Sequence, residues 1–327
     1  GITAERRDLL ETPGTFCTEP LIEPIPRYET VAWDLDDLVC QLPADDPLPG
    51  FDADARSAFV DLALAGLIDE RRSPKAGEPR AAYRIYEHQA TMLRRGVTRG
   101  TPGIVTSGTG SGKTESFLLP IFATIAQEAV RWKAPSAGFL SRRWWHAPKT
   151  GGTSTTQGSH KPDDAAQSNG TDAKTTTPTF QLQRHGEHPE RPKAVRALVL
   201  YPMNALVEDQ LARIRRALDS RKARSVMDQH FHGNRIFFGR YTSDTPVTGS
   251  RTPAPGPNGA ERHRQKVAEL LRASRDMERA QRRAAERDEE AAKEARAAGR
   301  EADDENVRFL FPSVDGGELT SRRDIQE

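Results

Sequence analysis

The chain has 327 residues, with 48 basic and 47 acidic side chains and a net charge of +1. This length allows about two domains of ~150 residues. A hydrophobic content of 35% is low for a wholly compact protein, so we expect part of the chain to lie outside any core. The sequence has no apolar run near the ~20 residues of a membrane span and no signal-peptide profile, and its two cysteines lack metal-like spacing. We therefore expect a soluble, cytoplasmic protein without a membrane partner.

Residues 1–80 are rich in proline and acidic residues, and only 52–68 have a clear helical pattern. A broad apolar face in that stretch combines Phe59, Val60, Leu62, Ala63, Leu64 and Leu67. We predict a mainly helical N-terminal accessory region over residues 1–80, followed by a second unit over 81–327.

A phosphate-binding loop is predicted at residues 107–114, between an apolar run at 103–106 and an amphipathic segment that begins at 117. A strand, a Gly-rich loop and a helix in that order let backbone N–H groups surround a phosphate. Lys113 would reach the β- and γ-phosphates, and the Thr114 hydroxyl would hold Mg²⁺. The candidate nucleotide-binding residues of the loop are Thr109, Gly110, Ser111, Gly112, Lys113 and Thr114.

An insertion is predicted at about residues 134–193. Its Ser/Thr/Gly-rich tract at 149–179 has too little apolar surface to offset the entropy of ordering, so we expect disorder there. The pair Trp144 and Trp145 could stack on nucleic-acid bases. We favour the alternative that the pair packs the base of the insertion onto the domain.

Two further strands are predicted at 195–201 and 235–241. The first is a continuous apolar run, which is typical of a parallel strand covered on both faces. A helix follows it, with Val207, Leu211, Ile214 and Leu218 on its inner side. The second strand leads into the turn Thr242-Ser-Asp-Thr-Pro246.

A second insertion is predicted at about 250–310. Residues 261–302 are rich in Glu, Arg and Ala and have almost no apolar seam after Met277, so we expect a solvated helix. The sequence has no sustained heptad there, which argues against a coiled coil. The acidic run at 288–290 follows no apolar strand, so we do not interpret it as a Mg²⁺-binding motif.

Four of these segments resemble motifs of superfamily 2 helicases of the DEAD/DEAH-box type. Residues 107–114 read Ser-x-Thr-Gly-x-Gly-Lys-Thr, which is similar to motif I, and Tyr86-Glu-His-Gln89 is similar to the Q motif. The stretch 202–210 resembles motif Ia, although Met203 and Asn204 stand where the family usually has Thr and a basic residue. Residues 241–245 resemble a backbone-contacting loop of DNA helicases, with Ser243 in place of glycine.

The resemblance implies an α/β fold for 81–327, namely a first RecA-like P-loop domain with a parallel sheet. It implies ATP and Mg²⁺ as cofactors, with Gln89 at the adenine, and single-stranded DNA as the partner. The implied nucleic-acid contacts are Pro202, Asn204, Ala205, Thr242, Asp244 and Thr245.

Motif II, which would position Mg²⁺ and the attacking water, is missing from the sequence. We therefore expect a truncated first RecA-like domain of an ATP-dependent helicase that is inactive by itself. The stretch 180–210 is also similar to large prokaryotic helicases such as the DrmA helicase of the DISARM anti-phage system, which implies partner subunits of a defence complex. Two alternatives remain open at this point: a P-loop ATPase acting on another substrate, and a catalytically inactive, nucleotide-sensing scaffold.

Overall fold

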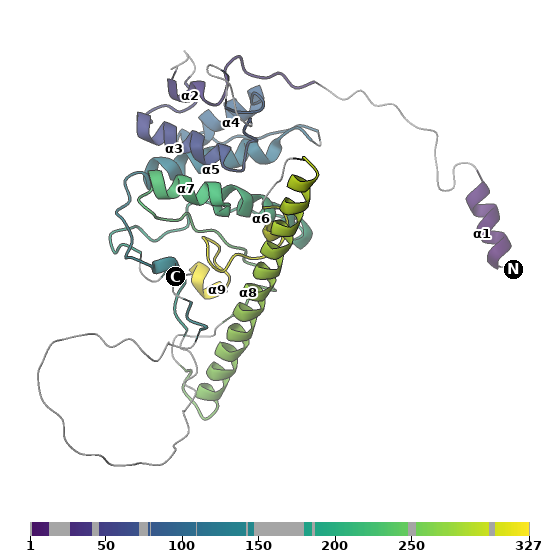
Figure 1. Cartoon of the computed structure of the whole chain (residues 1–327), viewed down its shortest axis with the longest axis vertical. Coiled ribbons are helices and arrows are strands. Elements are labelled where there is room, and N and C mark those ends of the chain that lie inside the picture. Colours follow the sequence, from purple (N-terminus) through teal and green to yellow (C-terminus); the bar gives the residue numbers. More distant parts are fainter. Residues whose placement is uncertain are drawn as a thin grey trace, which may run out of the picture.

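The computed structural model describes residues 2–12, 27–40, 46–71, 78, 80–108, 110–141, 143–146, 180–184, 187–247, 253–300 and 305–326. The predicted disordered tract at 149–179 therefore lies outside the described residues. Figure 1 shows the arrangement of the helices. None of the described helices is long and apolar enough to cross a membrane. The elements are α1 (Ile2–Glu11), α2 (Asp37–Cys40), α3 (Ala53–Leu64), α4 (Glu87–Val97), α5 (Lys113–Ala129), η1 (Phe139–Ser141), α6 (Asn204–Asp219), α7 (Arg221–His230), α8 (Gly259–Ala297), η2 (Val307–Leu310) and α9 (Arg322–Gln326).

Helix α3 begins where the sequence predicts it. The Asp52 carboxylate accepts a hydrogen bond from the Ala55 N–H at 2.9 Å, which satisfies one of the free donors of the first turn. Arg56 in this helix is buried, and its guanidinium donates to the carbonyls of Leu38 and Leu48 and to the Asp46 carboxylate. Arg56 therefore holds α2 and the residues near Asp46 against α3.

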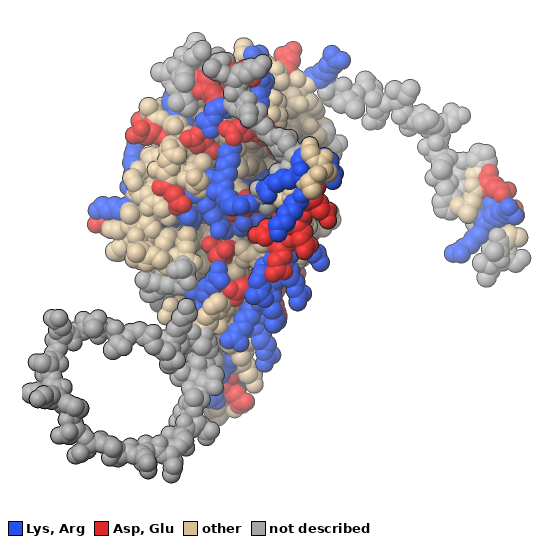
Figure 2. Space-filling model, viewed as in Figure 1, with Lys and Arg blue, Asp and Glu red and all other residues tan. Residues whose placement is uncertain are grey.

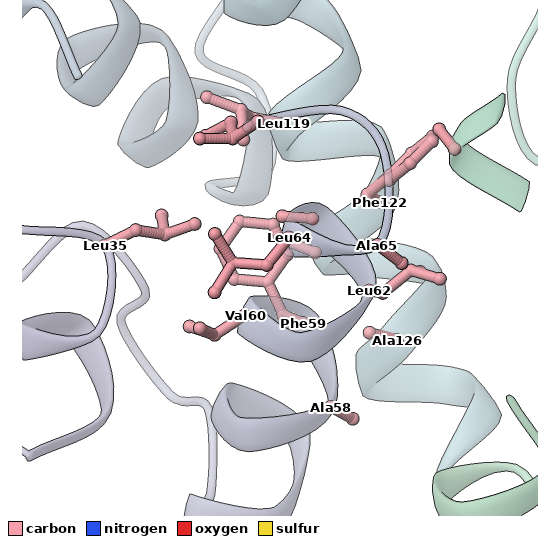
Figure 3. Packing of buried hydrophobic residues seen from close by; sticks show 14 of the residues in the cluster. Leu35, Ala58, Phe59, Val60, Leu62, Leu64, Ala65, Leu119, Phe122 and Ala126 are labelled. Carbon is pink, nitrogen blue, oxygen red and sulfur yellow. The ribbon is translucent and has the colours of Figure 1, made fainter. Parts of the chain in front are cut away.

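The main core lies where α5 packs against both α3 and α4, and α7 packs against α3. Figure 3 shows Phe59, Leu62 and Leu64 of α3 meeting Leu119 and Phe122 of α5. Helix α3 belongs to the predicted accessory region, yet it contributes much of this core. The boundary near residue 80 therefore does not separate two hydrophobic cores in the described residues, and its value as a domain boundary stays a prediction.

Helices α4 and α5 approach each other closely at Gly96. A Cβ on Gly96 would overlap the ring of Pro120, so the small residue on α4 makes room for the proline inside α5. The Thr124 hydroxyl donates to the Pro120 carbonyl at 2.8 Å. Pro120 is therefore a packing residue of this helix pair.

The predicted parallel sheet is not confirmed. Across the described ranges the structure has only isolated bridges: Thr30 with Tyr86, Glu70 with Ala81, and Phe238 with Glu318. Residues 103–107 and 195–201 have no ladder partner there, and Ile104 and Leu200 are 90% and 81% exposed. An apolar run forms a sheet only when a neighbouring strand takes up its backbone groups.

Helix α6 has a buried charge that its apolar pattern does not predict. Arg215 is 1% exposed, and its guanidinium makes two 2.8 Å hydrogen bonds to the Glu318 carboxylate. Leu211 and Leu218 are buried as predicted, and Ile214 is partly buried. The buried ion pair joins α6 to the segment that follows α8.

Helix α8 is long and largely exposed, but its inner side is buried further than the sequence predicts. Ala284, Asp288 and Ala292 are buried, and the Asp288 carboxylate accepts the backbone N–H groups of 306, 307 and 308. The predicted solvated helix is thus largely exposed, but its inner side is covered after Met277, where the acidic side chain of Asp288 caps η2.

The tryptophan pair packs against α8. Trp145 is 5% exposed, and its indole N–H donates to the Glu278 carboxylate at 2.9 Å. Trp144 lies edge-on to Phe180, with ring centroids 5.2 Å apart. The pair is therefore packed against α8 and Phe180, and its role in holding the insertion onto the domain stays a prediction.

Candidate nucleotide-binding site and nucleic-acid interface

The Gly-rich loop leads directly into α5 and requires glycine at two positions. Gly110 and Gly112 have φ angles of +77° and +71°, a region that residues with a Cβ rarely adopt. A Cβ on Gly112 would also overlap the Gln89 amide. The loop is therefore shaped by its backbone, as the sequence predicts, while Thr109 lies outside the described residues.

The Lys113 ammonium group turns back over the loop. Its Nζ donates to the Ser107 carbonyl at 2.8 Å and also to the Gly108 carbonyl. Lys113 and Thr114 occupy the first turn of α5, where the helix dipole favours an anion. A phosphate group at this place would meet the lysine charge and the helix N-terminus together.

Ser111 is held inside the loop. It is 1% exposed, and its hydroxyl donates to the Gly108 carbonyl at 2.8 Å and lies 2.6 Å from the Ser107 hydroxyl. The Nε2 atom of His88 lies 2.8 Å from the Ser111 carbonyl. These contacts use the Ser111 side chain to keep the loop closed, so its backbone N–H is the group left for a ligand.

Gln89 connects α4 to the loop. Its Oε1 accepts the Tyr86 N–H at 2.8 Å, and its Nε2 donates to the Gly112 carbonyl at 3.1 Å. The residue is 3% exposed. Both ends of the amide are thus engaged with backbone at the loop, and adenine recognition by Gln89 stays a prediction.

An aromatic cluster at the loop is not predicted by the sequence. The bridge between Thr30 and Tyr86 brings Tyr28 to the loop, where its hydroxyl accepts the Gly108 N–H at 2.8 Å. The Tyr28 and Tyr86 rings lie 5.7 Å apart, and Tyr86 stacks on His88 at 5.4 Å. No local pattern marks Tyr28, because its partner Gly108 lies 80 residues further along the chain.

The predicted nucleic-acid contacts fall into two neighbouring segments. Pro202, Asn204 and Ala205 are exposed at the start of α6, whose N-cap makes no side-chain hydrogen bond. An ion pair between Glu208 and Arg240 ties this first part of α6 to the end of the 235–241 segment. The tertiary structure therefore brings the two predicted segments together.

The turn at 242–246 is closed by its own side chains. Thr245 is 2% exposed, and its hydroxyl accepts the Thr242 N–H at 3.0 Å and donates to the Arg240 carbonyl at 2.9 Å. Arg322 donates to the Thr242 carbonyl at 2.7 Å. The Thr245 hydroxyl is thus used within the turn, while Asp244 is exposed.

A charged contact connects the two candidate sites. Glu115, one residue after Thr114, accepts a hydrogen bond from Arg213 of α6 at 3.0 Å.

The pKa of Tyr201, at the end of the 195–201 segment, is raised by burial. The Arg213 charge opposes that rise, and the Asp209 charge adds to it. Among the described residues, His, Cys, Asp and Glu form no group of three that could hold a metal ion.

Comparison with known proteins agrees with this arrangement. The family model of the DEAD/DEAH box helicases matches residues 86–236, which include the Gly-rich loop, Gln89 and the start of α6. Druantia protein DruE from Escherichia coli (strain UMEA 4076-1) is 28% identical over 254 residues, which cover 77% of this chain and 10% of that protein. No solved structure matches the chain.

The family match confirms the resemblance that the motifs predict. It implies a RecA-like fold for the matched segment. The chain spans about a tenth of the length of the Druantia relative. Residues 86–236 of this chain are therefore similar to the DEAD/DEAH box helicase domain.

Proposed function

We propose that the chain binds ATP with Mg²⁺ and contributes a nucleic-acid track to an ATP-dependent helicase or translocase that acts on DNA. The observation that carries this proposal is the closed Gly-rich loop, with Lys113 over its opening and Gly112 pressed against Gln89. ATP hydrolysis would supply the energy for movement along DNA. Lys113 would hold the β- and γ-phosphates, and the Thr114 hydroxyl would hold Mg²⁺.

The DNA would lie across the start of α6 and the turn at 242–246. The backbone N–H groups of Asn204 and Ala205, two exposed residues, would bind a phosphate at the helix N-terminus. These contacts would be made to the DNA backbone, so binding would not depend on sequence. The Glu115–Arg213 ion pair supports coupling of the two sites, because it joins the nucleotide helix to the helix of the track.

We further propose that 103–107 and 195–201 are strands of a parallel RecA-like sheet. Their apolar side chains support this, since they are otherwise exposed to water. We also place the protein among prokaryotic anti-phage helicases with partner subunits, and the similarity to Druantia protein DruE is consistent with that lineage.

The test is the ATPase activity of the full-length protein, measured with and without single-stranded DNA. Lys113→Ala should abolish activity under both conditions by removing the charge that anchors the phosphates. Lys133→Ala is the matched control, because it removes an exposed lysine paired only with Glu190 among the described residues. Wild-type rates in Lys113→Ala would refute the nucleotide site.

The same assay separates the alternatives. ATP hydrolysis that no nucleic acid stimulates would favour a P-loop ATPase acting on another substrate. Nucleotide binding without hydrolysis by the full-length protein would favour the nucleotide-sensing scaffold.

A further inference from the structure

We propose that one side of α8 is a docking surface for the phosphate backbone of duplex DNA, separate from the track at α6. We call this surface the α8 arginine row and define it by Arg272, Arg275, Arg279, Arg282 and Arg283. All five residues are exposed. They are spaced three or four residues apart, or adjacent at the end, which places them on one side of a helix. The row lies outside the segment 86–236 that matches the helicase family.

The positive charge of this row is largely uncompensated. Arg272, Arg282 and Arg283 make no ion pair within the part of the chain that the structure describes. Arg275 donates only to the Trp145 carbonyl, at 3.2 Å, and Arg279 pairs with Asp276. Figure 2 shows the basic side chains gathered along α8, with acidic ones closer to its C-terminal end.

Two exposed carboxylates lie beside the row: Asp276, which pairs with Arg279, and Glu286, three residues after Arg283. Glu278 turns to the inner side of α8, where its carboxylate meets Arg143, Trp145 and His146. Burial raises the pKa of Glu278, but these hydrogen bonds and the Arg143 charge bring the pKa below its ordinary value. The carboxylate is thus held ionised on the inner side of α8, and the outer side keeps an excess of arginine.

The row is presented on a fixed support. Leu270 and Ser274 are buried on the inner side of α8, and Asp288 anchors the helix to residues 306–308. Because the inner side is held at several points, the helix presents the backbone positions of the five arginines in a fixed arrangement.

Duplex DNA fits this row better than a single strand does. From Arg272 to Arg283 the helix extends roughly 17 Å, and one strand of B-form DNA carries about five phosphates over that length. Proteins that bind single strands stack bases on aromatic side chains, whereas 259–297 contains no Phe, Tyr or Trp. Arginine makes two parallel hydrogen bonds to a phosphate, so charge and geometry both match a duplex backbone.

The test uses the full-length protein and a short labelled duplex of mixed sequence, with binding followed by fluorescence anisotropy over a range of salt concentrations. The variant Arg272→Gln/Arg279→Gln/Arg283→Gln removes three charges from the row at little cost in helix propensity. The slope of log affinity against log salt should become shallower by about 2.7, or ~0.9 for each lost phosphate contact.

Two matched variants complete the design. Arg7→Gln/Arg99→Gln/Arg131→Gln removes three exposed arginines from other parts of the chain and should leave the slope unchanged. Replacement of the same three row residues by lysine should keep most of the slope, because the charge is retained. If both glutamine variants lost the same amount of salt slope, the proposal would be overturned. Binding would then depend on the net charge of the protein and not on the position of the arginines in α8.

The inference rests on the proposed function only in taking DNA as the polymer, and the two can fail separately. Equilibrium duplex binding needs no ATP, and stimulation of the ATPase by single-stranded DNA reports on the track at α6. An unchanged duplex affinity in the row variant, together with normal stimulation, would overturn the α8 proposal alone and point to an acidic protein partner. A protein that binds duplex DNA through the row but shows no stimulation would retain this proposal and lose the proposed function.

Discussion

Replacing Gln89 by alanine tests whether this amide shapes the phosphate loop or reads the base of a nucleotide. The substitution removes two hydrogen bonds, one from the Tyr86 N–H and one to the Gly112 carbonyl. The Gly112 carbonyl keeps two other donors, the N–H and the hydroxyl of Ser116, so only the Tyr86 N–H loses its partner. With ~1–3 kcal/mol for an unsatisfied buried donor and ~0.5–1.5 kcal/mol for the second bond, the free energy of unfolding should fall by about 3 kcal/mol.

Loop shaping predicts that ATP and GTP lose affinity by the same factor, because both depend on the phosphate cradle. Each 1.4 kcal/mol of loop distortion costs about a factor of ten in affinity. Urea unfolding measures the stability, and titration with fluorescent ATP and GTP analogues measures the two affinities. Gln89→Glu should also weaken both nucleotides, since a carboxylate oxygen would then face the Gly112 carbonyl. A loss confined to ATP, with unchanged stability, would refute the loop-shaping role and assign Gln89 to adenine.

Three further substitutions test the packing around the sites. Glu318→Ala should lower the free energy of unfolding by about 3–5 kcal/mol, because it leaves Arg215 buried without its anion; a loss below 1 kcal/mol in urea unfolding would contradict the buried pair. Gly96→Ala should cost about 1–3 kcal/mol by forcing α4 away from Pro120, and an unchanged melting temperature would show that the helices adjust freely. A hydrogen bond from Arg56 lowers the pKa of the Asp46 carboxyl below its ordinary value of 3.8. The ionised Asp46 therefore stabilises the fold above the unfolded-state pKa, and this stabilisation is lost as the pH falls through the lower pKa of the folded state. Asp46→Asn should therefore flatten the acid limb of stability against pH, and an identical limb in the variant would exclude Asp46 as a contributor.

Much of the candidate site can be predicted because its signals are local. Gly110, Gly112, Lys113 and Thr114 lie within five consecutive residues, and their backbone needs are met by the loop and the helix that follow each other in the chain. The start of α3 is equally local, since Asp52 caps a donor only three residues away. Such features depend on neighbours in sequence and are therefore visible in it.

Contacts between distant segments could not be predicted in this way. Tyr28 contacts Gly108 because the bridge between Thr30 and Tyr86 brings the two segments together. Arg215 is buried because it pairs with Glu318, which lies more than 100 residues further along the chain. The Thr245 hydroxyl points into its own turn and donates to the Arg240 carbonyl. The resemblance to the helicase motif does not specify this orientation.

The sequence by itself determined the Gly-rich loop, the helix that follows it and the similarity of residues 86–236 to the DEAD/DEAH box helicases. Only the tertiary structure decided which polar groups are buried and which aromatic rings border the loop. The physical reason is that a helix satisfies its backbone within one segment, whereas a strand or a buried ion pair depends on a partner from elsewhere in the chain.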